Sequence, residues 1–186
     1  MEQAMDTDAV LADTRRWIER AVLGLELCPF ARQPLRLGRV RFRVSAADQP
    51  EPLLRELAEE LLRLRDTPAS DCETTLLIHP RAFAGADRFE DFNDFLGLAD
   101  ALVEELQLDG ELQVASFHPG YRFADVAGSD PANYSNRSPH PILHLLREDS
   151  VSRAVEAFPD PDEIVERNIE TLERLGVDGF QRLLGE

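Results

Sequence analysis

The chain has 186 residues, a mass of 21.0 kDa and 43% hydrophobic residues, which suits one domain, residues 1–186, with a single core. Its formal net charge is -16 and no basic stripe with interleaved aromatic residues offsets this charge, so the composition argues against nucleic acid and anionic membranes as partners. All 20 basic residues are arginine, which excludes lysine-dependent chemistry such as a Schiff base or a Walker A phosphate loop.

Targeting signals and cysteine usage indicate a cytoplasmic protein. No apolar run approaches the ~20 residues that a membrane span needs, and the N-terminus lacks the basic start and apolar middle of a signal peptide. Two cysteines cannot form a disulfide framework, and a reducing compartment would keep them as thiols. We therefore expect a soluble cytoplasmic chain, and the sequence leaves its oligomeric state open.

The first elements are a helix and an edge strand. Apolar residues at helical spacing predict a helix from about residue 8 to 27, capped by Thr7 or Asp8 and ended near Cys28 by the following proline. Arginine then alternates with apolar residues over 39–44, which predicts a strand buried on one face. The charges along this strand indicate an edge position guarded against association.

The middle of the chain continues this alternation of helices and strands. Leucines at helical spacing predict a helix over 50–65, and the continuous apolar run 74–78 predicts a strand buried on both faces. Asp87, with an acid three residues later, predicts the start of a helix over 87–108. A third strand is predicted over 112–117, and like the second it stops at a His-Pro pair.

The last third of the chain predicts one strand and two helices. Residues 142–147 fit a strand or a helix, and we favour the strand because Ser150 resembles a fresh cap for a helix over 151–158. Asp160 and the proline after it predict the start of a final helix, which Gly176 ends. The order of elements predicts a single α/β domain with about five helices and a mixed sheet of three to four strands, the first three parallel and the fourth antiparallel to one of them.

Two histidines follow the ends of predicted strands. If the second and third strands are parallel neighbours, His79 and His118 meet at the sheet edge where open α/β sheets bind ligands. They would then form a general acid/base pair or, with His144, bind a metal, although each is equally explained as a structural histidine. Cys28 lies beside a chain-breaking motif and is a candidate nucleophile or soft metal ligand, with a buried inert thiol as the alternative.

Residues 118–141 form a long segment with neither helical nor strand periodicity, which predicts an ordered functional loop anchored by aromatic residues. Its arginines suit a carboxylate or phosphate, and its amides and carboxylates can add hydrogen bonds or orient a histidine. The alternative is that these side chains organise the loop itself. The candidate substrate-binding residues are Tyr121, Arg122, Asp125, Asn133, Asn136 and Arg137.

Three motifs carry a resemblance to a known family. They are Leu-Cys-Pro-Phe-Ala at 27–31, Phe-His-Pro-Gly-Tyr-Arg-Phe at 117–123, and Asn-Arg-Ser-Pro-His-Pro at 136–141 with the Leu-His-Leu-Leu-Arg-Glu that follows. The chain resembles a family of bacterial proteins known as a domain of unknown function. That resemblance implies a single-domain bacterial protein and supplies no activity, catalytic residue or cofactor.

Two functions fit the sequence. The first is a small-molecule enzyme of the hydrolytic or transfer class, in which a histidine moves a proton, Cys28 attacks, and a loop arginine holds an anionic substrate. The second is a non-catalytic ligand-binding or protein-interaction domain, in which the histidines are structural. A pocket that brings together Cys28, His79 and His118 would favour the enzyme.

Overall fold

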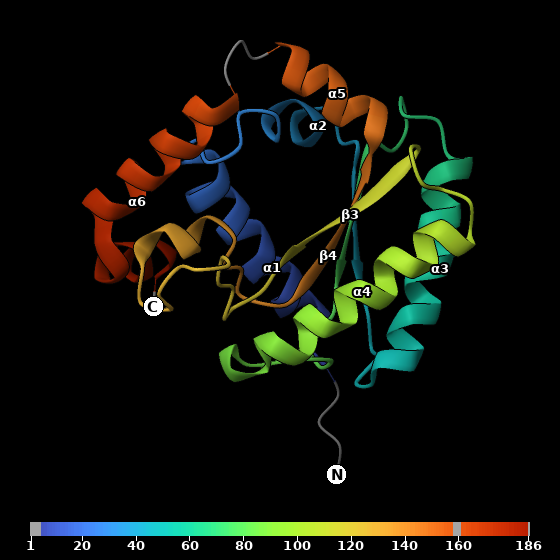
Figure 1. The fold of residues 1–186 in the computed structure, drawn as a ribbon, viewed down its shortest axis with the longest axis horizontal. Coiled ribbons are helices and arrows are strands. Elements are labelled where there is room, and N and C mark those ends of the chain that lie inside the picture. Colours follow the sequence, from blue (N-terminus) through green and yellow to red (C-terminus); the bar gives the residue numbers. More distant parts are fainter. Residues whose placement is uncertain (1–4, 158–160, 186) are drawn as a thin grey trace.

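A computed structural model describes residues 5–157 and 161–185 (Figure 1). The six α-helices of this part of the chain are α1 (Thr7–Trp17), α2 (Arg32–Arg36), α3 (Pro50–Asp66), α4 (Phe89–Glu105), α5 (Glu148–Ala157) and α6 (Pro161–Leu184). The four strands are β1 (Val40–Val44), β2 (Thr74–Ile78), β3 (Leu112–Phe117) and β4 (Ile142–Arg147). A π-helix, η1 (Ile18–Leu23), extends α1, and two short 3-10 helices are η2 (Ala86–Arg88) and η3 (Pro131–Ser135).

The four strands form one mixed sheet in the order β1-β2-β4-β3. β1 pairs with β2 in parallel, and β4 runs antiparallel to both β2 and β3. The α/β class, the strand at 142–147 and the antiparallel fourth strand are confirmed, but the prediction of three parallel strands is wrong because β4 lies between β2 and β3. The physical reason is burial: β2 and β4 are the most buried strands and occupy the two central positions, where the helices cover both faces of the sheet.

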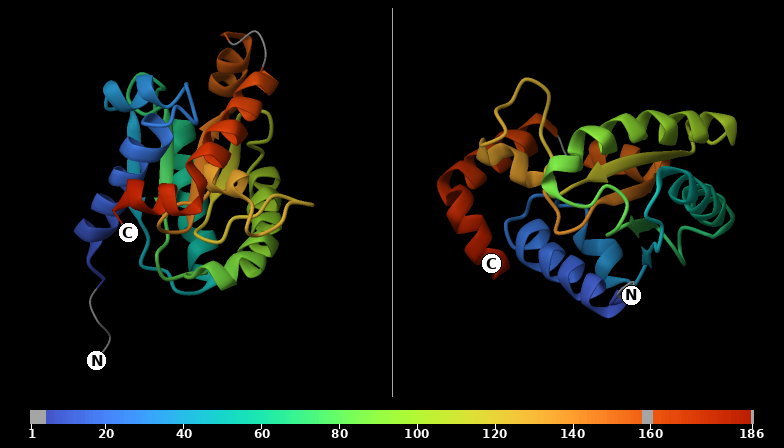
Figure 2. Two further views of the ribbon diagram at one scale, coloured as in Figure 1. Left: turned by 90° about the vertical axis from the view of Figure 1, so that its left-hand side faces the viewer. Right: turned by 90° about the horizontal axis from the view of Figure 1, so that it is seen from below.

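The sheet separates two apolar layers. Leu77 points toward the layer of α3 and α4, whereas Leu76 and Ile78 point toward the layer of α1 and α6, as expected for successive residues of a strand. Figure 2 shows α4 and α1 on opposite sides of the sheet. Each fully buried leucine or phenylalanine in these layers stabilises the fold by about 1.5 to 3 kcal/mol relative to an exposed one.

Several predicted helix ends differ from the structure. Asp6, not Thr7 or Asp8, caps α1, since its carboxylate accepts a hydrogen bond from the Ala9 amide at 3.0 Å. The first helical segment ends with η1, several residues before Cys28, and the short helix α2 follows. The expected start signal at Asp87 does not cap a helix, because η2 occupies that position and leads directly into α4.

The C-terminal helices also depart from the prediction in part. Ser150 is not a cap, because α5 begins directly after β4 and the Ser150 hydroxyl donates instead to the carboxylate of Glu73. Gly176 interrupts α6 with a φ of 66°, as expected, but the helix resumes and continues to Leu184. The predicted cap Asp160 and the predicted last residue of the preceding helix, Phe158, lie outside the described residues. No helix within the described ranges is both long and apolar enough to cross a membrane.

Candidate functional site

His79 and His118 lie at the same end of the sheet, which we call the histidine edge, because each follows the last residue of a strand. The two strands are not parallel neighbours. The last residues of β2 and β3, Ile78 and Phe117, both pair with Ile142 of β4. The two histidines that follow therefore flank the start of the same central strand. This convergence was expected from two adjacent parallel strands, and it arises instead through the antiparallel strand between them.

The two imidazoles pack against one phenylalanine. The ring centroid of Phe92, on α4, lies 5.3 Å from that of His79 and 5.0 Å from that of His118. Both histidines are 0% exposed. A substrate would need the covering segments to move before it could reach either ring, so the environment is that of a core and favours structural histidines.

The hydrogen bonds of the two rings differ. His118 donates from Nε2 to the Phe83 carbonyl at 2.9 Å, and its Nδ1 accepts from the Gly120 amide at 3.0 Å, so both ring nitrogens are satisfied. His79 donates from Nδ1 to the Ala82 carbonyl at 3.0 Å. Its Nε2 is buried and has no hydrogen-bond partner among the described residues.

Burial keeps both rings uncharged at neutral pH. It lowers the pKa of His79 to about 4 in spite of the hydrogen bond to the Ala82 carbonyl, and the neighbouring His118 ring acts in the same direction as burial. Burial also lowers the pKa of His118, against the opposing hydrogen bond to the Phe83 carbonyl. A neutral ring accepts a proton poorly from this environment, which weakens the case for general base catalysis.

Cys28 is not part of this histidine site. It immediately precedes the turn into α2, and Figure 1 places α2 at the end of the sheet opposite to the start of α4, near which β2 and β3 end. Burial raises the pKa of the Cys28 thiol, although the backbone amides of Phe30 and Ala31 oppose this shift. The thiol is therefore protonated at neutral pH and lacks the activation that a nucleophile needs.

His144 lies on the other face of the sheet from His79 and His118. It shares its face with Ile142, and its ring packs against Phe117 at 5.8 Å, in the layer of α1 and α6. Its Nε2 donates to the hydroxyl of Thr74 at 2.8 Å, and that hydroxyl donates onward to the Leu145 carbonyl at 2.6 Å. The structure thus separates His144 from the other two candidate ligands. Over residues 5–157 and 161–185, no group of three or more His, Cys, Asp or Glu could hold a metal ion.

The arginines of the long loop are occupied within the protein. Arg137 donates from Nε to the Tyr121 carbonyl at 3.1 Å and from Nη2 to the Gly128 carbonyl at 2.7 Å, and its guanidinium lies 4.4 Å from the ring centroid of Tyr134. Arg122 forms an ion pair with Glu90 of α4. These contacts match the structural alternative, in which the arginines organise the loop.

The polar residues of the loop have similar structural roles. Asn133 is fully buried, accepts from the Phe123 amide at 3.0 Å and donates to the Ala127 carbonyl at 2.8 Å. Asn136 accepts from the Ser135 hydroxyl, and Asp125 adopts a φ of 61°. Burial raises the pKa of Tyr121, whose ring packs against Phe89 and Phe123. The turn that these contacts hold stands out from the body in both views of Figure 2.

A groove that the sequence did not predict lies beside β1, between α1 and the end of α3. We call it the arginine groove, because Arg15 of α1, Arg39 and Arg41 at β1, and Arg63 of α3 line its volume of about 480 Å³. The alternating arginines of the strand were visible in the sequence. The contributions of α1 and α3 were not, because they depend on how these helices pack on the strand.

The arginine groove carries a local excess of positive charge. Arg41 donates to the Glu60 carboxylate at 2.7 and 2.9 Å, and Arg63 lies 3.8 Å from the same carboxylate. The Arg15 guanidinium lies 4.2 Å from the ring centroid of Phe42, and the Arg39 side chain has no hydrogen-bond or ion-pair partner among the described residues. Four arginines and one carboxylate, that of Asp71, line the groove, and Glu60 pairs with Arg41 and Arg63 beside it, in a chain with a net charge of -16.

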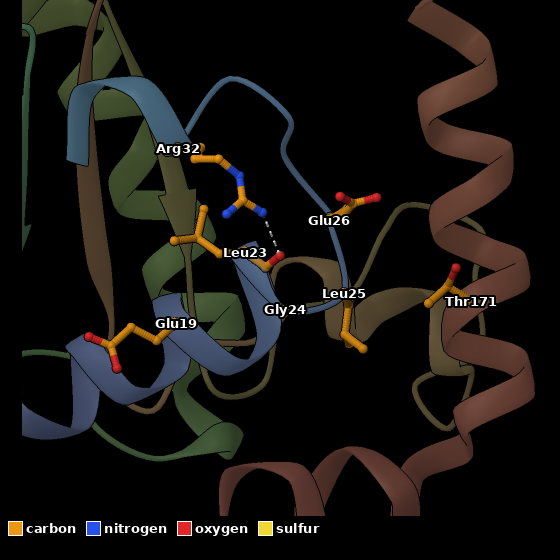
Figure 3. Close-up of a pocket in the computed structure, with 7 residues that line it drawn as sticks. All are labelled: Glu19, Leu23, Gly24, Leu25, Glu26, Arg32 and Thr171. Carbon is orange, nitrogen blue, oxygen red and sulfur yellow. Dashed lines mark hydrogen bonds between the residues drawn. The ribbon is translucent and has the colours of Figure 1, made fainter. Parts of the chain in front are cut away.

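A second pocket, of about 620 Å³, lies between the end of η1, α2 and α6. Figure 3 shows that its two carboxylates, Glu19 and Glu26, point away from one another, and that the Arg32 guanidinium turns toward the Leu23 carbonyl. The charged groups do not converge on a common position. The pocket therefore provides fewer converging charged groups for a ligand than the arginine groove does.

Comparisons with known proteins place the chain in a family and leave its activity open. No curated protein and no solved structure matches the chain. A family profile does match, and it spans residues 9–182, which include the histidine edge, the long loop and the arginine groove. The chain therefore belongs to the family described as "Protein of unknown function (DUF1415)".

Proposed function

We propose that the protein is a non-catalytic binding protein whose arginine groove holds an acidic ligand. One observation carries this proposal: guanidinium groups from α1, β1 and α3 line one groove in a chain whose net charge is -16. The net charge of the chain repels an anion, whereas a local excess of arginine attracts one. A binding function also agrees with the buried, hydrogen-bonded state of the histidines.

The groove is suited to carboxylates in particular. Glu60 fixes the orientation of the Arg41 guanidinium, and the Phe42 ring supports that of Arg15, so a ligand would order few side chains when it binds. No described residue pairs with the Arg39 side chain, so its guanidinium can donate to a ligand. A guanidinium binds a carboxylate through two parallel hydrogen bonds, which gives affinity and orientation together.

The test uses hexaglutamate as a dense carboxylate probe in isothermal titration calorimetry at low and high salt. We expect Arg15→Ala with Arg39→Ala to weaken binding about tenfold or more, because two charge-assisted contacts are lost. The control, Arg55→Ala with Arg88→Ala, removes the same charge from exposed helix and turn positions outside the groove. Equal weakening in both variants, or no binding at low salt, would contradict the proposal.

A second candidate function is proton transfer at the histidine edge, in an enzyme of the hydrolytic or transfer class. The buried Nε2 of His79 favours it, because the lone pair of this nitrogen has no hydrogen-bond partner among the described residues and could meet a proton of a bound substrate, although the ring is a weak base. Hydrolysis of p-nitrophenyl acetate or p-nitrophenyl phosphate tests it. Turnover that disappears in His79→Asn and persists in His144→Asn would support catalysis, and equal rates in all three proteins would reject it.

A further inference from the structure

β1 leaves one side of its backbone unpaired. Within residues 5–157 and 161–185, it ends the sheet and has β2 as its single neighbour. The Arg39 carbonyl accepts from the Glu73 amide at 2.8 Å and the Ser45 amide donates to the Ile78 carbonyl at 2.7 Å, so the odd-numbered positions face β2. The amides and carbonyls of Val40, Phe42 and Val44 therefore face away from the sheet.

This open edge is accessible from the arginine groove. No backbone hydrogen bond to the outward groups of the strand is found among the described residues. Every residue of β1 keeps some exposed surface, whereas every residue of β2 is buried. Residues 38–42 line the groove, so the groove runs along the first part of β1. An exposed strand edge of this kind is a ready template for another strand.

The side chains around the edge define what such a strand must carry. Arg41 and Arg43 lie on one face of β1, where Arg41 pairs with Glu60 of α3 and the charge of Arg43 also acts on that carboxylate. On the other face, Phe42 packs beneath Arg15. A second copy of β1 would bring these arginines against each other and be repelled. An acidic strand would pair with them instead.

From these contacts we infer that the ligand of the arginine groove is an acidic polypeptide segment in extended conformation, which pairs with β1 as a fifth strand. This inference rests on the proposed function and narrows its ligand from any acidic molecule to a peptide. The backbone of the segment supplies hydrogen bonds to Val40, Phe42 and Val44, and its carboxylates at every second position meet the arginines. Its remaining side chains face Phe42 and Leu11, so apolar residues fit there.

The test compares the peptide acetyl-Val-Glu-Val-Glu-Val-Glu-amide with the same peptide methylated at its backbone nitrogens. Methylation removes the donors and keeps the charge, so we expect at least a tenfold loss of affinity, equivalent to two or more hydrogen bonds. Binding of the unmodified peptide should also slow hydrogen exchange at the amides of Val40, Phe42 and Val44. Citrate at the same carboxylate concentration serves as the small-anion comparison.

The outcomes separate this inference from the function on which it rests. Binding that needs Arg15 and Arg39 but is equal for the methylated peptide, or is matched by citrate, overturns strand addition and leaves an anion-binding groove. Binding that is unaffected by loss of these arginines overturns both. Arginine-dependent binding with a tenfold loss on methylation and protection of the β1 amides supports both.

Discussion

The guanidinium of Arg41 donates two hydrogen bonds to the carboxylate of Glu60, from Nε to Oε2 at 2.7 Å and from Nη2 to Oε1 at 2.9 Å. The Glu60 side chain is 7% exposed and that of Arg41 is 36% exposed. Burial alone would raise the pKa of Glu60, but the hydrogen bonds and charge of Arg41, with the charges of Arg63 and Arg43, lower it overall. This pair ties β1 to α3 and fixes one wall of the arginine groove.

Glu60→Gln should weaken the fold and strengthen anion binding at the same time. The substitution leaves Arg41 half-paired, and since that arginine is partly solvated we expect a loss of about 1 to 2 kcal/mol in the free energy of unfolding. It also removes a negative charge beside the groove, so hexaglutamate should bind more tightly. Urea titration and calorimetry measure the two effects. The control is Glu51→Gln, an exposed partner of Arg55 on the same helix, for which we expect less than about 0.5 kcal/mol and unchanged affinity.

Gly120 and Gly97 should respond to alanine in opposite directions. A Cβ at Gly120 would overlap the Ala86 carbonyl oxygen, so the loop after His118 must shift, and we expect a cost of about 3 kcal/mol in the free energy of unfolding. A Cβ at Gly97 meets no atom within 4 Å on an exposed face of α4, where alanine should stabilise by about 1 kcal/mol. Thermal unfolding of the two variants gives the comparison, and a stable Gly120→Ala protein would contradict the close approach of these two segments.

Asn133→Asp should destabilise the folded conformation of the long loop, residues 118–141, whereas Asn136→Asp should leave it unchanged. The first change replaces the amide that donates to the Ala127 carbonyl with an oxygen that repels it in a buried position, which we expect to cost about 2 to 3 kcal/mol. In the part of the chain that the structure describes, the side chain of Asn136 only accepts, from the Ser135 hydroxyl, and aspartate keeps that acceptor. Limited proteolysis should therefore cut the first variant faster within residues 121–137. Equal cleavage of both variants would show that the amide does not hold the loop.

The order of the strands could not be predicted from the sequence, although the strands themselves could. Local sequence patterns specify three of the strands: β1 alternates apolar and polar residues, and β2 and β4 are apolar runs. Burial on one face produces the alternation, and burial on both faces produces the continuous run. Neighbouring β2 and β3 would have satisfied the same patterns. What decides is that β4 buries Leu143 and Leu145 in the layer of α3 and α4 and Ile142 in the layer of α1 and α6. Both layers cover a strand fully only in the middle of the sheet, which is a property of the assembled fold.

The candidate site was predicted in part for the same reason. The two His-Pro pairs correctly indicated that His79 and His118 follow strands that end at one edge of the sheet. Their burial could not be foreseen, because the covering ring of Phe92 comes from α4. The arginine groove was missed because Arg15 and Arg63 belong to helices whose sequences look like ordinary solvated surfaces until β1 packs between them.

His79 should make the fold lose stability as the solution is acidified from about pH 6.5 to pH 4. The pKa of His79 is about 4 in the folded protein, below the value of about 6.5 expected in the unfolded chain. Between these two pH values the unfolded chain binds a proton at His79, whereas the folded chain does not. The free energy of unfolding should therefore fall by about 1.4 kcal/mol for each pH unit of acidification because of this ring. Above pH 6.5 the ring should no longer make stability depend on pH.

His79→Asn removes the titration and keeps a donor for the Ala82 carbonyl, so the stability of this variant should depend less steeply on pH by that amount. His144→Asn provides a second case, since burial also lowers the pKa of His144 to about 4 on the opposite face of the sheet. Urea midpoints measured at pH 5, 6 and 7 give the slopes, and a slope unchanged in both variants would mean that these rings are protonated, and hence solvated, in the folded protein.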